Sequence, residues 1–288
     1  MRMMKKILIA LLFCFTFISA ISYIRILINA WNKEHFVINE RVYHQEEALI
    51  NCLMITGKNN ERIELAKKSV NNFLDQTYMN KKLVIVNHHP YLTVLNNNQS
   101  DNLFEFRVDK THDISLGELR NMSLQMVALN SYWIPWDDDD YRSNDFLSVL
   151  FEVLRRNKAD AVVFTRRYEY NMNTQFAWQM QLKSGFPIIL CKHNPLIKYE
   201  DKDTMEDVNL IQSVRDKGMK VLIYDNHPRL YIRVVHKSNT SLFVKKNKIN
   251  ISSNLGVNIK YSNYVEENVD DSEKKYIVNK VNDILATS

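Results

Sequence analysis

Four consecutive aspartates, residues 137–140, are the side chains of this chain whose type and spacing most clearly suggest chemistry. They directly follow the bulky apolar run SYWIPW, residues 131–136, which is typical of a buried strand. Carboxylates crowded at such a place repel one another unless they are solvated or neutralised. A divalent cation would neutralise them, because carboxylate oxygens are hard ligands that suit Mg²⁺ or Mn²⁺, and such ions commonly bridge to a diphosphate. The alternative is an acidic turn that caps the following helix, where aspartate is favoured near the N-terminus.

The elements that must position the aspartates alternate between strand and helix. Nearly continuous apolar runs indicate strands buried on both faces, and apolar residues that recur at helical spacing indicate amphipathic helices. Strands are predicted at 48–56, 81–90, 103–109, 131–136 and 160–170, and helices at 61–77, 115–129 and 143–159. This order predicts an α/β fold with a largely parallel sheet. Ligands of such sheets bind beyond the carboxyl ends of the strands, which is where the aspartates fall.

The N-terminus has the pattern of a chain that enters the secretory membrane. A basic flank, residues 1–6, precedes an uncharged apolar run at 7–24, and a polar stem follows at 25–47. The run approaches the roughly 20 residues that a membrane-spanning helix needs, so we expect a signal-anchor. The alternatives are a cleaved signal ending at Ala20 and a buried N-terminal helix. The positive flank predicts a single-pass type II membrane protein with its remainder in the ER or Golgi lumen or outside the cell, or a secreted protein after cleavage.

The charge balance argues against a nucleic-acid partner. The chain has 38 Lys and Arg against 33 Asp and Glu, a net charge of +5, and its lysines are scattered rather than gathered in a patch. Outside the apolar run, Cys52 and Cys191 could pair in an oxidising compartment or remain two buried thiols. Glycosylation sequons begin at Asn98, Asn121, Asn239 and Asn250. In so asparagine-rich a chain, these sequons add little to the case for a lumenal location.

Four segments, in order along the chain, resemble the family 2 glycosyltransferases of the GT-A fold. YWIPWDDDDYRSNDFL (132–147) is similar to the family's metal-binding segment, in which Asp-x-Asp-Asp lies between an apolar strand and a helix. SLGELRNMSLQMVAL (115–129) resembles its Gly-x-x-Arg-Asn helix, and DTMEDVNLIQSVRDKGMKVLIY (203–224) resembles its Glu-Asp helix start. LYIRVVHKSNTS (230–241) is similar to its closing Tyr-x-Arg-x-x-His-x-x-Asn-x-Ser segment. The resemblance covers roughly residues 49–243, and its specificity comes from the four motifs together.

The resemblance implies a GT-A type fold, which is a Rossmann-like, mostly parallel sheet flanked by helices. This domain would occupy residues 48–244, with a C-terminal extension at 245–288. The implied activity is the metal-dependent, inverting transfer of a sugar from a nucleotide-diphosphate sugar to a hydroxyl of a glycan, protein or lipid acceptor, with Mn²⁺ or Mg²⁺ as cofactor. Two other activities remain open: a nucleotidyltransferase, and a non-catalytic protein that binds nucleotide sugars or glycans.

The resemblance also assigns catalytic and metal-binding roles to particular residues. Asp207 matches the family's base, held ionised at the start of a helix, and the neighbouring Glu206 would orient the acceptor or the base. The metal would be held mainly by Asp139, with Asp137 on the metal or the ribose. His236 matches a position that ligates the metal or touches the diphosphate.

Contacts to the nucleotide are implied for Thr56, Asn59, Asn87, Arg120, Asp137 and Asp138. Two of these residues depart from the family pattern, because Thr56 stands where the first-strand turn usually has Pro and Asn87 where the second strand usually ends in Asp. Asparagine can still hydrogen-bond a base or a ribose. Arg120 is expected near the diphosphate side of the site.

Three further sets of side chains have two interpretations each. Arg233 could clamp a phosphate or be a surface charge. Trp133 and Trp136 could stack on a sugar or base, although alternation along a buried strand favours core packing. Phe176 and Trp178 could form an acceptor platform or pack within a helix.

Overall fold

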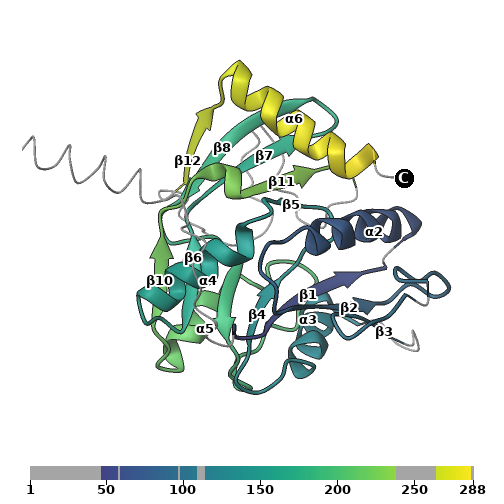
Figure 1. Ribbon diagram of the computed structural model, residues 1–288, viewed down its shortest axis with the longest axis vertical. Coiled ribbons are helices and arrows are strands. Elements are labelled where there is room, and N and C mark those ends of the chain that lie inside the picture. The colour runs from purple at the N-terminus through teal and green to yellow at the C-terminus, as the bar shows by residue number, and fades with distance from the viewer. Residues whose placement is uncertain (1–46, 58, 97, 109–113, 238–263, 287–288) are drawn as a thin grey trace, which may run out of the picture. The chain divides into compact units, whose positions relative to one another are not determined.

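Two β-sheets packed against helices carry the described part of the chain (Figure 1). The computed structural model describes residues 47–57, 59–96, 98–108, 114–237 and 264–286. The predicted basic flank and apolar run, and the predicted stem up to residue 46, lie outside these residues. Among the residues described, no helix combines the length and the apolar character needed to cross a membrane.

The larger sheet has seven strands in the order β10-β6-β9-β4-β1-β2-β3. In chain order these are β1 (Ile50–Thr56), β2 (Lys81–Asn87), β3 (Leu103–Arg107), β4 (Tyr132–Pro135), β6 (Ala161–Phe164), β9 (Ile189–Lys192) and β10 (Val221–Tyr224). β9 runs antiparallel to its neighbours β4 and β6, and the other neighbouring pairs are parallel. The prediction of a mostly parallel sheet is confirmed for this sheet.

Helices cover both faces of the larger sheet, which explains why its central strands are apolar at successive positions. The α-helices among the described residues are α2 (Asn60–Leu74), α3 (Leu116–Gln125), α4 (Phe146–Arg156), α5 (Leu210–Asp216) and α6 (Asp271–Ala286). Side chains of α2 and α4 share a core cluster with Cys52 and Met54 of β1. Side chains of α3 and α5 share a second cluster with Leu53, which points to the opposite face. The strand ends, where the aspartates lie, are therefore held by a sheet packed on both sides.

The second sheet was not predicted from the sequence. It has five strands in the order β12-β8-β7-β11-β5. These are β5 (Tyr141–Arg142), β7 (Arg166–Asn171), β8 (Phe176–Leu182), β11 (Tyr231–Val235) and β12 (Tyr264–Asn268). Within it only β7 and β11 pair in parallel. β5 follows the aspartates directly and pairs with β11, so one of the smallest strands ties the acidic segment to this second sheet.

The single strand predicted at 160–170 is two strands that belong to different sheets. The break falls at Thr165, whose backbone N–H donates to the Asn226 side chain at 3.1 Å. The backbone N–H of Arg166 donates to the same oxygen at 2.8 Å. Asn226, itself buried, thereby satisfies the backbone where the chain leaves β6 and enters β7. Both halves have strand-forming composition, so the sequence carried no sign of the break.

Part of the predicted C-terminal extension belongs to the second sheet. β12 pairs antiparallel with β8, and α6 follows it (Figure 1). Ile277 and Val281 of α6 are fully buried in a cluster with Tyr168 and Ile232. Glu273 accepts a hydrogen bond from the Tyr168 hydroxyl at 2.7 Å. The described residues after 263 therefore stabilise the sheet that carries β5 and β11.

Candidate functional site

The four aspartates lie in the turn between β4 and β5, and groups from α2, α3, β1 and β11 hold them. Asp137 accepts a hydrogen bond from Arg120 of α3 at 3.2 Å. Its side chain keeps 30% of its surface exposed, whereas that of Asp138 has none. Asp138 accepts a hydrogen bond from the Thr56 hydroxyl at the end of β1 at 2.7 Å. The crowded carboxylates of the sequence thus gain partners from several elements, which offsets their mutual repulsion.

Asp139 and Asp140 complete this arrangement on the side of α2 and β11. Asp139 Oδ2 pairs with the guanidinium of Arg62 of α2 and lies 3.1 Å from His236 Nε2, just beyond β11. Asp140 accepts hydrogen bonds from the Tyr231 hydroxyl at 2.5 Å and from the backbone N–H of Val234 at 2.9 Å. Asp140 is therefore a structural anchor between the turn and β11. Asp139 faces the guanidinium of Arg62 and the imidazole of His236.

Burial changes the proton affinity of two of the aspartates. It raises the pKa of Asp138 to about 7, and the neighbouring aspartates add to the rise while Arg62 opposes it. It likewise raises the pKa of Asp140 to about 7, again with the help of the neighbouring aspartates. These two carboxyls bind protons near neutral pH when the chain is folded.

Asp139 shifts in the opposite direction. Burial alone would raise its pKa, but Arg62 and His236 outweigh burial and hold the pKa well below the ordinary aspartate value. Asp139 therefore stays ionised in the folded protein, which is the form that binds a cation.

The raised pKa of Asp140 predicts that the protein loses stability as the pH rises. Between about pH 4 and pH 7 the native state keeps a proton that the unfolded chain has released, so the free energy of unfolding falls with pH by up to about 1.4 kcal/mol per unit for this group. Asp140→Asn removes that contribution, because asparagine cannot ionise. We therefore expect the melting temperature of Asp140→Asn minus that of the wild type to increase as the pH is raised from 5 to 7.5. Asp216→Asn, which removes an exposed carboxylate, is the matched control. A difference in melting temperature between Asp140→Asn and the wild type that stays constant across this pH range would contradict the raised pKa of Asp140.

Glu206 and Asp207 lie close to the aspartates because Arg120 joins the two groups. Arg120 donates from Nε to Glu206 Oε1 at 2.9 Å and from Nη2 to Asp137 Oδ1. Burial raises the pKa of Asp207, and Arg120 opposes the rise while Asp137 adds to it, so all of these charges interact at short range. Burial also raises the pKa of Glu206 against the influence of Arg120. The structure thus brings both predicted catalytic acids close to the acidic turn.

The helix predicted to begin at the Glu206–Asp207 pair starts later. α5 begins at Leu210, and residues 206–209 form a turn that precedes it. Met205, directly before the pair, has a φ of 61°, a left-handed conformation that is uncommon outside glycine. The prediction that a helix N-terminus keeps Asp207 ionised is wrong. Its environment is set by burial and by Arg120, and its pKa is raised rather than lowered.

Gly117 lets α3 approach the segment that carries the two acids. A Cβ at this position would lie 1.8 Å from the backbone oxygen of Glu200, and the Gly117 N–H donates to the backbone oxygen of Lys202 at 2.9 Å. Asn121 holds the same segment through the Tyr199 backbone, donating to its oxygen at 3.0 Å and accepting from its N–H at 2.8 Å. The predicted Gly-x-x-Arg-Asn motif therefore docks residues 199–202 so that Arg120 reaches Glu206.

Gly117→Ala is expected to weaken both stability and activity. The added methyl group collides with backbone atoms, so the segment 199–207 must move away from α3, at a cost of about 1–3 kcal/mol. We expect a lower melting temperature and a fall in kcat of at least tenfold, because Arg120 and Glu206 separate. Gly218→Ala is a control for the loss of a glycine, since a Cβ there meets no atom within 4 Å, although its φ of 74° adds backbone strain. Full activity in Gly117→Ala would show that this close approach does not position the acids.

The remaining predicted nucleotide contacts are occupied within the protein. Asn59 caps α2 by accepting from the Arg62 backbone N–H at 2.9 Å. Asn87 is fully buried, and its side chain donates to Leu92 O at 2.9 Å and to Glu105 Oε1 at 2.7 Å. These residues shape the loops after β1 and β2. Direct contact of Asn59 or Asn87 with a nucleotide stays a prediction.

Two arginines that the sequence analysis did not single out are central to the site. Arg62 bridges Asp138 and Asp139. Arg142 is fully buried, with its guanidinium carbon 4.1 Å from the centre of the Trp136 ring, and it donates to the backbone oxygens of Asp137 and Asp140 at 3.2 and 3.1 Å. Arg142 thereby fixes the backbone of the acidic turn. The only available signal was the need for positive charge near four carboxylates.

Arg233 has the character of a buried charge rather than a surface one. Its side chain is 13% exposed, and Nη1 lies 3.6 Å from Glu169, which Arg167 also contacts. Counted over the described residues, the linked carboxylates are Asp137, Asp138, Asp139, Asp140, Glu169, Glu206 and Asp207, and the linked arginines are Arg62, Arg120, Arg142, Arg167 and Arg233. Carboxyl groups thus outnumber arginines by two in this network, and the raised pKa values of Asp138 and Asp140 reduce its negative charge near neutral pH.

The donor set fits a hard divalent cation that also takes ligands from its substrate. Asp139 and His236 lie together, whereas Asp137, the third predicted ligand, pairs with Arg120. Within the described ranges, no group of three or more His, Cys, Asp or Glu side chains is arranged to hold a metal ion. Mg²⁺-type ions are commonly bound by one or two carboxylates and complete their coordination with substrate phosphates and water. Of the three predicted protein ligands, two are thus brought into contact.

The aromatic and cysteine predictions have definite outcomes. Trp133 and Trp136 are fully buried in the two core clusters, which confirms core packing. Trp178 is buried and lies on strand β8, where it stacks on Phe176 with 5.6 Å between ring centres, so the predicted helix is wrong. Cys52 and Cys191 are unpaired.

The sequon at Asn121 is not available for glycosylation in the folded chain, because its amide nitrogen donates to Tyr199. Asn98 is exposed. Asn239 and Asn250 lie outside the described residues.

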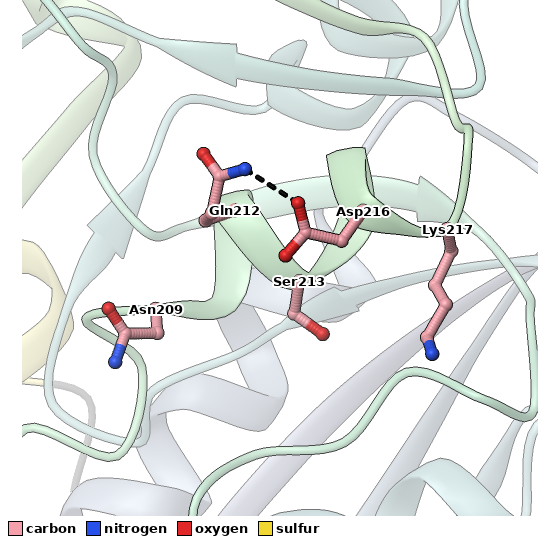
Figure 2. A pocket seen from close by; sticks show the side chains of 5 residues that line it. All are labelled: Asn209, Gln212, Ser213, Asp216 and Lys217. Atoms are coloured by element: carbon pink, nitrogen blue, oxygen red, sulfur yellow. Dashed lines mark hydrogen bonds between the residues drawn. The ribbon is translucent and has the colours of Figure 1, made fainter.

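A surface pocket follows the polar side of α5, apart from the acidic turn. Figure 2 shows its lining side chains, Asn209, Gln212, Ser213, Asp216 and Lys217. Gln212 donates to Asp216 at 2.7 Å (Figure 2). None of these five residues belongs to the carboxylate and arginine network, so the pocket is not part of the candidate site.

Comparison with protein families gives one match. The model described as "Glycosyl transferase family 2" matches residues 55–237, which is more than half of the chain. The matched region extends from the end of β1 to the residue after His236 and includes every site residue discussed above. The comparison with curated proteins gave no match.

Solved structures give similarities at low identity. The chain is similar to "S. aureus TarS 1-349", with 14% identity, a TM-score of 0.49, and coverage of 64% of this chain and 60% of that chain. It is also similar to "Mannosyltransferase PcManGT from Pyrobaculum calidifontis in complex with GDP-Man and Mn2+", with 11% identity, a TM-score of 0.49, and coverage of 74% and 66%. The chain thus covers about three fifths of the TarS chain.

Proposed function

Because the chain belongs to glycosyl transferase family 2 and is therefore a glycosyltransferase, we propose that it transfers a sugar from a nucleotide-diphosphate sugar to a hydroxyl acceptor, with inversion and with a divalent cation. The observation that carries this proposal is the position of Arg120, which bonds to Asp137 at the donor end and to Glu206 beside the candidate base. The residues proposed to bind the donor and those proposed to activate the acceptor thus belong to one hydrogen-bonded network. The acceptor class, whether glycan, protein or lipid, stays open.

In the proposed reaction Asp207 is the general base. Its carboxylate takes the proton of the acceptor hydroxyl while the oxygen forms a bond to the anomeric carbon, and the bond from that carbon to the diphosphate oxygen breaks on the opposite face. The raised pKa of Asp207 suits this role, because a base with a pKa closer to the working pH accepts a proton more readily. Glu206, which Arg120 holds by a hydrogen bond, positions its neighbour Asp207.

The leaving diphosphate gains negative charge, and the site supplies positive charge to match it. Asp139 and His236 would hold Mn²⁺ or Mg²⁺, which stabilises a leaving oxyanion when it is bound. Asp137, the most exposed of the four aspartates, is the carboxylate best placed to reach a ligand. Arg142 keeps the turn in place by binding its backbone oxygens.

Incubation with a panel of UDP-, GDP- and CDP-sugars and Mn²⁺ tests the proposal. We expect release of the nucleoside diphosphate from one donor class, dependence on the cation, and loss of turnover in Asp139→Asn. Exposed Asp216→Asn is the matched control and should retain wild-type rates. Donor binding without turnover would favour a non-catalytic member, and pyrophosphate release from a nucleoside triphosphate would favour a nucleotidyltransferase.

We also propose that residues 7–24 anchor the protein in a membrane, with the catalytic domain in the lumen or outside the cell. The proposal rests on the basic flank and the uncharged run alone. Expression of the full chain, followed by alkaline extraction of membranes, tests it. Recovery of the protein in the soluble fraction at full length would contradict the anchor, and recovery of a shortened soluble form would indicate a cleaved signal.

A further inference from the structure

The guanidinium of Arg62 contacts the same oxygen of Asp139 that faces His236. Nη1 of Arg62 lies 2.5 Å from Asp139 Oδ2, and Nη2 lies 2.6 Å from Asp138 Oδ1. His236 Nε2 lies 3.1 Å from the same Asp139 oxygen. The side chain of Arg62 is only 14% exposed, so water weakens these contacts little.

The backbone of Arg62 is held in a way that directs its side chain to the acidic turn. Its N–H donates to the Asn59 side chain at 2.9 Å, which caps α2. Its backbone oxygen lies 3.1 Å from the Thr56 hydroxyl, the same hydroxyl that lies 2.7 Å from Asp138. Arg62 and the acidic turn are thus fixed to one another through the end of β1. Such double fixation is typical of a positioned charge rather than of a chance surface ion pair.

We propose that Arg62 is a displaceable internal counter-ion that competes with the divalent cation for Asp139. This inference rests on the metal dependence stated under the proposed function. Oδ2 of Asp139 already accepts from a guanidinium and an imidazole, so a cation that binds this oxygen must displace Arg62. A donor diphosphate favours that movement, because the guanidinium fork matches phosphate oxygens as well as carboxylates. The cation therefore binds weakly to the nucleotide-free protein and tightly together with the nucleotide.

Direct measurement of Mn²⁺ binding to the full chain, by electron paramagnetic resonance of the free ion, tests the inference without any assay of turnover. The wild type is expected to bind Mn²⁺ weakly alone and at least tenfold more tightly with whichever of UDP, GDP or CDP it binds. Arg62→Met is expected to bind Mn²⁺ alone at least tenfold more tightly than the wild type. In Arg62→Met the gain in Mn²⁺ affinity that the nucleotide produces should be correspondingly smaller than in the wild type.

Three further variants separate competition from other effects. Arg62→Lys keeps the positive charge but can reach only one of the two carboxylates, so an intermediate gain in Mn²⁺ affinity is expected; it also serves if Arg62→Met does not fold. The double variant with Asp139→Asn should show no gain. Arg155→Met, on the exposed face of α4, should bind Mn²⁺ as the wild type does.

The outcomes distinguish this inference from the function on which it rests. If the wild type binds Mn²⁺ with a nucleotide but neither Arg62 variant gains affinity without one, the competition is overturned and the proposed function stands. If no nucleotide leads to Mn²⁺ binding by any of the proteins, the proposed metal dependence fails and the competition fails with it.

Discussion

Replacing Asp207 with asparagine is expected to lower kcat by about 10²–10⁴-fold, the usual contribution of a positioned general base. Asparagine keeps the shape of the side chain but cannot take the proton of the acceptor hydroxyl. Binding of the donor, measured by calorimetry, should change little, because Arg120 and Asp137 on the donor side are retained. The melting temperature should not fall, since the substitution removes a carboxyl that burial disfavours in its charged form.

The pH dependence of the wild type provides a second test of Asp207. The base must be ionised to act, and burial raises its pKa, so kcat/KM should rise with pH on an acid limb that lies above the ordinary aspartate value of 3.8. Asp207→Asn should lose this limb from its residual activity. Asp216→Asn is the control, because it removes an exposed acid from α5. A wild-type rate in Asp207→Asn would exclude this residue as the base.

Replacing Arg120 with methionine is expected to have the largest combined effect on stability and activity. Arg120 is the partner of both Asp137 and Glu206, and the Glu206 side chain is only 6% exposed. Removing one member of such a pair leaves a buried carboxylate without its counter-charge, at a cost on the order of 3 kcal/mol. Activity should fall at least 100-fold, because the donor and base ends of the site are no longer joined. Chemical denaturation and a donor turnover assay measure the two effects.

The contributions of the charge of Arg120 and of its planar geometry to stability and activity can be measured separately. Arg120→Lys keeps the charge but cannot donate to two carboxylates from one planar group, so stability should recover more than activity does. A double-mutant cycle with Glu206→Gln should give a coupling energy of about 1–3 kcal/mol. Arg155→Met, which breaks only exposed pairs with Glu152, should leave the free energy of unfolding and the activation free energy of turnover unchanged within about 0.5 kcal/mol. A coupling energy near zero would show that the contact between Arg120 and Glu206 has no energetic weight.

Several strands of the larger sheet, and their order along the chain, follow from local patterns in the sequence, whereas β9, β10 and the order of the strands within the sheet were not predicted. The apolar runs of β1 and β2 and the helical spacing in α2 are readable because each depends on residues that are neighbours in the chain. The acidic turn after β4 is readable for the same reason, since four adjacent carboxylates need a partner wherever the chain places them. The second sheet was not readable, because β5 has two residues and β6 and β7 are separated only by Thr165.

The sequence by itself determined that this chain is a strand-and-helix protein with acidic chemistry past a strand end, and its motif order indicated the family. Only the tertiary structure decided which partner each carboxylate has. Asp138 and Asp139 share Arg62 from a helix that lies far earlier in the chain, while Asp140 is buried against β11. Proton affinity and charge pairing depend on burial and on distances between segments remote in sequence, and no local pattern records either. The proton affinity of Asp207, which is set by burial and by the nearby charges of Arg120 and Asp137 rather than by a helix N-terminus, is the clearest instance.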